Sequence, residues 1–120
     1  MKTLVADDDS GVRGFLAAVL ADAGYEVLQA QDGAEVLRLC AAEPVDLVLT
    51  DLCMPEKEGF ETMRALRERG HALKVIAISG AFQSEFLPMA RKLGADAVLP
   101  KPIDPEKLLE TVGQVLGTRS

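Results

Sequence analysis

Short apolar runs alternate with amphipathic helical patterns along the whole chain. Five runs predict strands at residues 3–6, 26–30, 45–50, 75–78 and 97–99. Continuous apolar runs of this length are typical of strands that are buried on both faces of a sheet. Between the runs, apolar residues recur at spacings of three and four, which indicates one buried face of a helix. The clearest such face consists of Val12, Phe15, Leu16, Val19 and Leu20.

Glycine, proline and aspartate residues mark the ends of five predicted helices. Aspartate caps the free N–H groups at a helix start, proline is tolerated in the first turn, and glycine ends a helix in the left-handed conformation. The markers are, in chain order, Gly24 after the first helix, Asp32-Gly33 and Pro44 around the second, Gly70 after the third, Pro88 and Gly94 around the fourth, and Asp104-Pro105 before the fifth. The apolar face of the third helix begins at Phe60.

The regular alternation of strand and helix defines the expected fold class. Strands joined through helices by right-handed crossovers form a parallel sheet that carries helices on both faces. The sequence therefore predicts an α/β protein, a three-layer αβα sandwich. We expect residues 1–120 to form one domain, because 120 residues match the size of a common domain and no linker or repeat interrupts them.

Composition excludes several classes of function. Thirteen basic and nineteen acidic residues give a net charge of −6, which disfavours direct binding to nucleic acid through its phosphates. No apolar run approaches the about 18 residues needed to span a bilayer, and the N-terminus is too short and acidic for a signal sequence, so no membrane insertion is expected. Cys40 and Cys53 fit neither a disulfide framework nor a metal-binding repeat. We expect both cysteine thiols to be reduced, as is usual in a cytoplasmic protein.

Polar residues follow four of the five predicted strands. In parallel sheets, ligands bind beyond the carboxyl ends of the strands, near the switch in strand order. If the strand order is 2-1-3-4-5, these four ends converge on one edge of the sheet. The residues at these ends are Asp7-Asp8-Asp9, Asp51, Ser79-Gly80 and Lys101-Pro102.

This convergence predicts a site for a phosphoryl group. Crowded carboxylates repel, so either their pKa values rise or a cation binds, and an all-oxygen site suits Mg²⁺. The ammonium of Lys101 and the hydroxyl of Ser79 would complete a cradle for a phosphoryl group, with Asp51 as the acceptor. Taken singly, the three aspartates, Ser79 and Lys101 are more often a solvated turn, a helix start or surface charge, whereas Asp51 alone fits either interpretation. Their combination at four strand ends favours the phosphoryl site.

The same residues resemble the receiver domain of two-component response regulators, across essentially the whole chain, and are similar to stand-alone chemotaxis-type receivers. The resemblance implies a flavodoxin-like, doubly wound (βα)5 fold. The order and spacing of four segments carry it: Leu-Val-Ala-Asp7-Asp8-Asp9, Leu-Val-Leu-Thr-Asp51-Leu-Cys-Met-Pro with Gly59, Ile-Ala-Ile-Ser79-Gly80, and Gly94-Ala-Asp-Ala-Val-Leu-Pro-Lys101-Pro102.

The resemblance implies a role for each site residue. Asp51 corresponds to the aspartate that a histidine kinase or phosphotransfer protein phosphorylates. The implied Mg²⁺ ligands, which also accept Mn²⁺, are the side chains of Asp8 and Asp51 and the carbonyl of Cys53, with Asp7 acting through water. Ser79 corresponds to the residue that binds the phosphoryl group and moves on activation, and Lys101 to the lysine that pairs with Asp51. The Lys101-Pro102 peptide is commonly cis in the family.

Two departures from the family pattern bear on the switch. The strand position that usually holds Tyr or Phe is Val98, which has no ring to swing inward behind Ser79. Cys53 and Ala81 flank the site where polar side chains often orient water. Neither orients water well, so we expect a long-lived phosphate. Phe82 and Phe86, beside Ser79, are either core residues or part of an output surface.

Three functions compete on this sequence. The leading one is a phosphorylation-activated signalling switch, which is not an enzyme but a phosphoacceptor with self-catalysed phosphotransfer and slow autodephosphorylation. Its downstream target is unknown, and no output domain is expected within the 120 residues. The second is a haloacid-dehalogenase-like phosphatase with Asp7 as nucleophile and Asp9 as its paired acid. The third is a receiver-like interaction module that never uses phosphate.

Overall fold

In the computed structural model, the described residues form five strands and four helices arranged in three layers. The structure describes residues 1–51, 58–68, 73–79 and 94–117, with the backbone alone for residues 58–60 and 79. The strands are β1 (Lys2–Ala6), β2 (Glu26–Ala30), β3 (Leu47–Asp51), β4 (Lys74–Ser79) and β5 (Ala97–Pro100). The helices are α1 (Ser10–Asp22), α2 (Gly33–Ala42), α3 (Glu58–Glu68) and α5 (Pro105–Leu116). The predicted helix across residues 87–93 lies outside the described residues.

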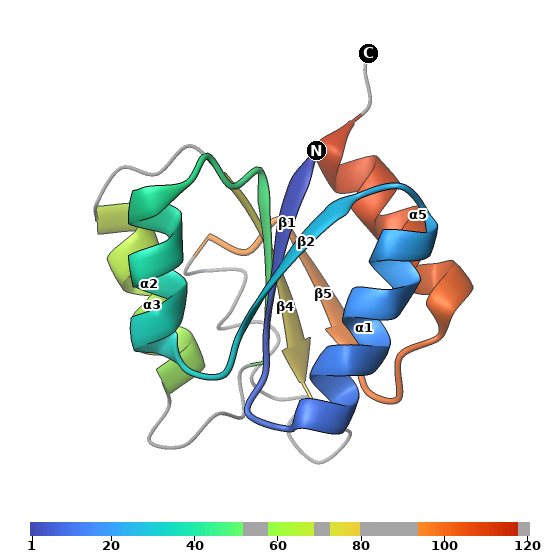
Figure 1. Cartoon of the computed structure of the whole chain (residues 1–120), viewed down its shortest axis with the longest axis horizontal. Coiled ribbons are helices and arrows are strands. Elements are labelled where there is room, and N and C mark those ends of the chain that lie inside the picture. The colour runs from blue at the N-terminus through green and yellow to red at the C-terminus, as the bar shows by residue number, and fades with distance from the viewer. Residues whose placement is uncertain (52–57, 69–72, 80–93, 118–120) are drawn as a thin grey trace.

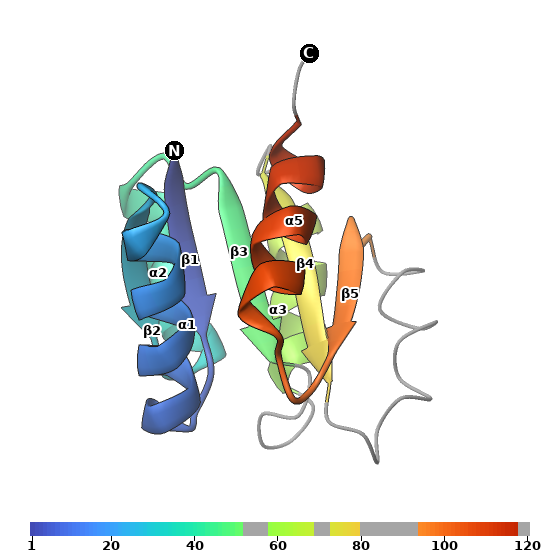
Figure 2. The same cartoon turned by 90° about the vertical axis from the view of Figure 1, so that its right-hand side faces the viewer.

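The strands form one parallel sheet in the order β2-β1-β3-β4-β5, which confirms the predicted fold. Strand β1 lies between β2 and β3, and its Leu4 pairs with Leu28 of β2 and with Val48 of β3. Helices α1 and α5 cover one face of the sheet, and α2 and α3 cover the other (Figures 1 and 2). The carboxyl ends of all five strands therefore lie along the same edge.

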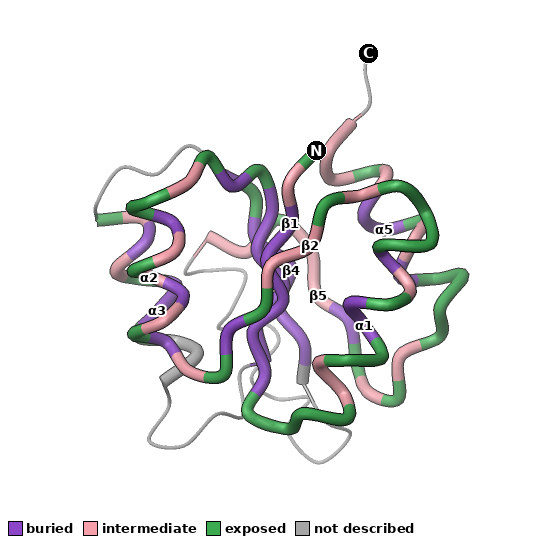
Figure 3. The backbone as a smooth tube through the Cα atoms, viewed as in Figure 1, coloured by how far each residue is buried: buried purple, intermediate pink, exposed green. Residues whose placement is uncertain are grey.

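Each face of the sheet has its own apolar core, because successive side chains of a strand point to opposite faces. Among the described residues, β1, β3 and β4 are mostly buried, whereas the outer strands β2 and β5 are mostly intermediate or exposed (Figure 3). The α2/α3 core contains Leu4, Val48 and Ala77 from the strands, with Val36, Cys40, Met63 and Leu66 from the helices. The α1/α5 core contains Val5, Leu49, Ile76, Ile78 and Leu99, with Leu16, Leu20, Leu108 and Val112.

Aspartate side chains begin three of the helices. Asp32 accepts a hydrogen bond from the N–H of Glu35, and Asp104 accepts one from Glu106 ahead of a helix with proline in its first turn. Both starts confirm the predicted caps. Asp9 caps the start of α1 in the same way, a role that the sequence did not distinguish within the run of three aspartates. Gly24 follows α1 with a φ of 97°, a left-handed conformation that glycine adopts without strain.

Two sequence expectations need correction. The predicted strand at 45–50 begins at Leu47 and ends at Asp51, because pairing with β4 reaches the Asp51–Ile78 pair. Phe15, expected on the buried face of α1, is 44% exposed, whereas Leu16 and Leu20 of that face are fully buried. Phe15 lies at the edge of the apolar stripe, beyond the reach of the α1/α5 core.

Arg67 of α3 connects several segments at the amino ends of the strands, opposite the carboxyl ends. Its guanidinium donates hydrogen bonds to the carbonyls of Leu73 and Gly94 and to the carboxylate of Asp96. Asp96 in turn accepts a hydrogen bond from the N–H of Val75 in β4. One side chain thus joins α3 to the entries of β4 and β5. None of the helices in the described part of the chain is long and apolar enough to cross a bilayer.

Candidate functional site

Three charged residues extend the α1/α5 face of the sheet past its apolar core. Asp7, Asp51 and Lys101 each lie two positions after a buried core residue, namely Val5, Leu49 and Leu99. The alternation of side chains that buries those apolar residues also directs the charged ones toward the same side of the sheet edge. The fold therefore assembles the site from three strands that are far apart in sequence.

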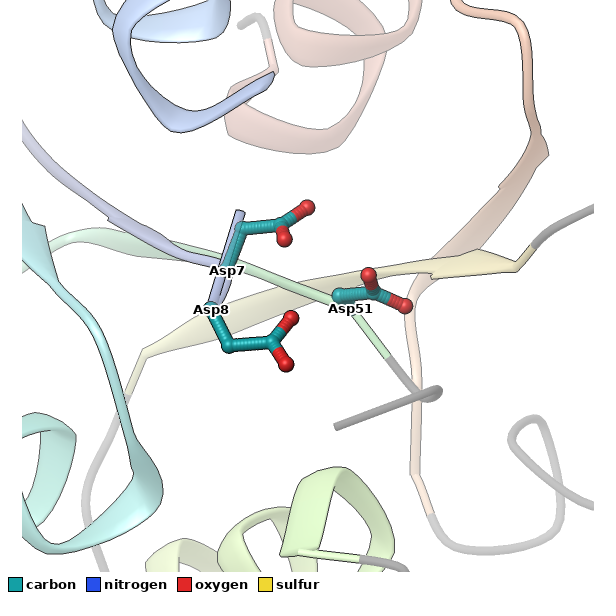
Figure 4. Close-up of side chains that lie close together, drawn as sticks. All are labelled: Asp7, Asp8 and Asp51. Atoms are coloured by element: carbon teal, nitrogen blue, oxygen red, sulfur yellow. The ribbon is translucent and has the colours of Figure 1, made fainter. Parts of the chain in front are cut away.

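Three carboxylates gather at the ends of β1 and β3. One carboxylate oxygen from each of Asp7, Asp8 and Asp51 lies within 4.8 Å of the other two (Figure 4). Asp7 and Asp51 are almost completely buried, with 1% and 2% of their surfaces exposed, whereas Asp8 faces solvent. The cluster therefore combines two desolvated acids with one that remains accessible from outside.

Lys101 supplies the positive charge closest to these acids. Its Nζ donates a hydrogen bond of 2.7 Å to Oδ2 of Asp51 and lies 3.3 Å from Oδ2 of Asp7. Partial burial lowers the pKa of Lys101, but the contacts with Asp51 and Asp7 outweigh it and raise the pKa above its usual value. The lysine therefore stays protonated. Its peptide bond to Pro102 is cis, as the family resemblance implied.

Asp7 remains incompletely satisfied despite this lysine. Burial, reinforced by the charge of Asp51, raises the pKa of Asp7 from 3.8 to about 6, against the opposing effects of the Asp9 N–H and of Lys101. Its Oδ1 accepts a hydrogen bond from that N–H at 2.9 Å. Its Oδ2 is buried and accepts no hydrogen bond among the described residues. The 3.3 Å ion pair with Lys101 only partly offsets the cost of burying this charge, and a bound cation would lower that cost further.

The loop that carries Asp7 and Asp8 is held by Asp9 and by Arg13, and no sequence pattern singled out Arg13. Asp9 caps α1 by accepting hydrogen bonds from the N–H groups of Gly11 and Val12. Arg13, one turn into α1, donates from Nη1 to the carbonyl of Asp7 at 2.8 Å. The acidic run gave a signal for the cap, but the arginine contact depends on where the loop lies in space.

The other predicted site residues are placed only in part. The backbone of Ser79 ends β4, paired with Pro100, and its side chain lies outside the described set, as do Cys53, Ala81, Phe82 and Phe86. Val98 is half-buried in β5, pairs with Ala77 and packs against the α2/α3 core. The structure therefore brings together the three acids and Lys101, and leaves the serine hydroxyl and the Cys53 carbonyl as predictions.

The donor set fits a magnesium ion. Carboxylate oxygens are the ligands that Mg²⁺ prefers, and it commonly uses one or two carboxylates while it keeps several waters. The unsatisfied Oδ2 of Asp7 and the exposed carboxylate of Asp8 provide both a need for positive charge and access to solvent. The ligand atoms of the described cluster are carboxylate oxygens, which a hard cation prefers.

A doubly wound sheet with clustered acids and a lysine at its carboxyl edge defines a class of signalling domains that carry a phosphoryl group on aspartate. Comparison with known proteins identifies the family: this chain belongs to the response regulator receiver domain family, whose profile matches residues 3–113. Receiver domains are the phosphorylation-activated switches of two-component signalling, and this chain is one of them.

Individual relatives agree with this assignment. The response regulator MprA of Mycolicibacterium vanbaalenii is 37% identical over 116 residues, which are 97% of this chain and 50% of MprA. The CAI-1 autoinducer sensor kinase/phosphatase CqsS of Vibrio cholerae is 37% identical over 114 residues, 92% of this chain and 17% of CqsS. The chain thus spans half the length, or less, of these curated relatives.

Solved structures match the fold over nearly its whole length. The chemotaxis response regulator CheY4 of Vibrio cholerae superposes with a TM-score of 0.87 at 33% identity, covering 95% of this chain and 97% of CheY4. The receiver domain of the Francisella response regulator 1452 gives a TM-score of 0.87 at 30% identity, covering 96% and 95%. The haloacid-dehalogenase alternative, with Asp7 as nucleophile, is not favoured by any of these matches.

Proposed function

We propose that Asp51 accepts a phosphoryl group from a phosphohistidine of a histidine kinase or phosphotransfer protein. The observation that carries this proposal is the 2.7 Å contact between Lys101 Nζ and Asp51 Oδ2 within the acid cluster. A carboxylate oxygen of Asp51 attacks phosphorus, an acyl P–O bond forms, and the P–N bond to the donor histidine breaks. The electron pair of that bond stays with the imidazole, which then takes up a proton.

Lys101 and the surrounding acids have different electrostatic roles in phosphoryl transfer. Lys101 stays protonated and offsets the negative charge that accumulates as a phosphoryl group approaches a carboxylate. Asp8, Asp51 and the carbonyl of Cys53 would hold Mg²⁺, or Mn²⁺ in its place, and Asp7 would act through a bound water. The metal, when bound, supplies the additional positive charge that draws the anions together.

We further propose that the phosphorylated state is read through Ser79 and Val98. The hydroxyl of Ser79 would bind the phosphoryl group, since β4 ends at this residue beside the acceptor strand. Val98 would respond by a change in packing rather than by a swinging ring. The domain is then a phosphoacceptor and not a metabolic enzyme. Slow self-catalysed hydrolysis would follow from Cys53 and Ala81, and a half-life of only seconds without a phosphatase would refute that point.

A groove next to Lys101 suits the phosphoryl donor. A cavity of about 490 Å³ lies between the start of α1 and the loop before α5, and Lys101 is among its lining residues. The other lining residues are Gly11, Val12, Phe15, Pro102 and Ile103. Because Lys101 also contacts the acceptor, a segment seated in this groove is held beside Asp51. We propose that the histidine-bearing segment of the phosphoryl donor occupies this groove. We also propose that this transfer takes place in the cytoplasm.

Intact-mass measurement after treatment with acetyl phosphate and Mg²⁺ tests the proposed chemistry. The wild type should gain one phosphate, and Asp51→Asn should gain none. Labelling that persists in Asp51→Asn but disappears in Asp7→Asn would instead support the phosphatase. Absence of both labelling and Mg²⁺ binding in the wild type would support a phosphate-independent module.

A further inference from the structure

We propose that Arg13 is a positioning residue for the metal-binding carboxylates, acting through the main chain of Asp7. The inference rests on the metal site of the proposed function and deepens it. Arg13 lies on α1 and touches none of the three carboxylates in its recorded contacts. Its effect on them must therefore pass through the loop between β1 and α1.

The guanidinium bridges the loop after β1 and strand β2. Its Nη1 donates to the carbonyl of Asp7 at 2.8 Å, and its Nε donates to Oε1 of Gln29 in β2 at 3.2 Å. A guanidinium is planar and holds its donors in fixed directions, so two simultaneous hydrogen bonds define the position of the group. Gln29 therefore orients Arg13, and Arg13 orients the carbonyl of Asp7.

Fixing this carbonyl fixes the backbone of Asp8. The carbonyl of Asp7 and the nitrogen of Asp8 belong to one planar peptide unit, which moves as a rigid group. The other side of the loop is held by the bond from the Asp9 N–H to Asp7 and by the Asp9 cap of α1. Asp8 is exposed, so its carboxylate approaches the cluster mainly because its backbone is held in place.

Simple electrostatics predicts the opposite effect of removing Arg13. A positive side chain near an acidic cluster repels an incoming cation, so its loss should tighten Mg²⁺ binding. A positioning role predicts weaker binding instead, because the ligands would have to be ordered when the ion arrives. The direction of the change in affinity therefore distinguishes the two roles.

Titration of the full chain with Mg²⁺ by calorimetry provides the test. We expect Arg13→Met to weaken binding about tenfold, the size of effect seen when a group that orients metal ligands is removed. Arg13→Lys, which keeps the charge and a donor, should recover part of the affinity. Gln29→Leu should weaken binding in the same direction by a smaller factor.

A matched control and a stability measurement complete the design. Arg38→Met removes an equivalent charge from the exposed face of α2, where Arg38 pairs only at 3.5 Å with Glu35 among its recorded contacts, and should leave Mg²⁺ affinity unchanged. Equal or tighter binding by Arg13→Met would overturn the inference alone, even if urea denaturation showed a loss of stability. Failure of the wild type to bind Mg²⁺ would overturn the proposed metal site together with it.

Discussion

Replacing Asp7 with asparagine removes a charge that the fold itself disfavours. The carboxyl group is 1% exposed, its Oδ2 accepts no hydrogen bond among the described residues, and burial next to Asp51 raises its pKa to about 6. Asparagine keeps an oxygen that can accept the bond from the Asp9 N–H. We therefore expect Asp7→Asn to be more stable than the wild type at neutral and higher pH without metal.

The pKa gives the size and the sign of this effect. Because the folded pKa lies above the ordinary value of 3.8, the folded state holds the proton more tightly than the unfolded chain. The stability contribution of Asp7 is therefore lost as the pH rises from about 4 through about 6. The difference in pKa corresponds to about 3 kcal/mol at pH 8, which is the upper limit of the gain for Asp7→Asn.

Urea denaturation measures this gain with and without Mg²⁺. Without metal, the advantage of Asp7→Asn should rise from near zero at about pH 4 to about 2–3 kcal/mol at about pH 8. Saturating Mg²⁺ should stabilise the wild type more than the variant, because the ion binds the folded wild-type site more tightly. Asp22→Asn removes the same charge from the exposed end of α1 and should change stability by less than about 0.5 kcal/mol.

Two results would refute this reasoning. A variant less stable than the wild type at pH 8 without metal would mean that Lys101 more than compensates the buried charge of Asp7. A difference independent of pH would mean that the effect comes from packing and not from ionisation.

Three further predictions address metal binding, docking and the fold. Mg²⁺ affinity, measured by calorimetry, should fall as the pH drops below about 6, because protonation of Asp7 removes charge from the site; equal affinities at about pH 5 and pH 8 would contradict this. Phe15→Ala should lower kcat/KM for transfer from a donor protein about tenfold while leaving labelling by acetyl phosphate unchanged, and equal losses in both would reject the groove. Gly94→Ala should lower the free energy of unfolding in urea by about 2 kcal/mol, because φ is +103° and a Cβ would lie 2.9 Å from Nε of Arg67. Gly14→Ala, in open space on α1, should instead raise it by about 0.5–1 kcal/mol. An unchanged stability of Gly94→Ala would argue against strain at this position.

The alternation of apolar runs and amphipathic patterns predicts the three layers, because a strand that is buried on both faces leaves a continuous apolar run in the sequence. The acids after β1 and at the end of β3, and Lys101 after β5, could be assigned to one edge, since parallel strands all end on the same side. The first and last residues of a strand are harder to predict from sequence, because they depend on hydrogen bonding to the neighbouring strands. Asp51 belongs to β3 since it pairs with Ile78, a contact that no local pattern records.

Side-chain roles that depend on a distant neighbour could not be predicted. Phe15 fits the apolar stripe of α1, but only the position of the helix over the sheet decides that it faces solvent. Arg13 resembles any surface arginine until β2 brings Gln29 beside β1. The buried state of Asp7 and the exposed state of Asp8 likewise follow from the path of the loop, which the acidic run does not define.

Location of the phosphate on the chain tests the central claim most directly. Borohydride reduces an aspartyl phosphate to homoserine, and peptide mass spectrometry of the protein treated with acetyl phosphate and Mg²⁺ identifies the converted residue. We expect homoserine at position 51, and none when Mg²⁺ is chelated or when Asp51 is replaced by asparagine. Conversion at Asp7, or at any residue outside the site beside Lys101, would contradict the assignment of Asp51 as the phosphoacceptor.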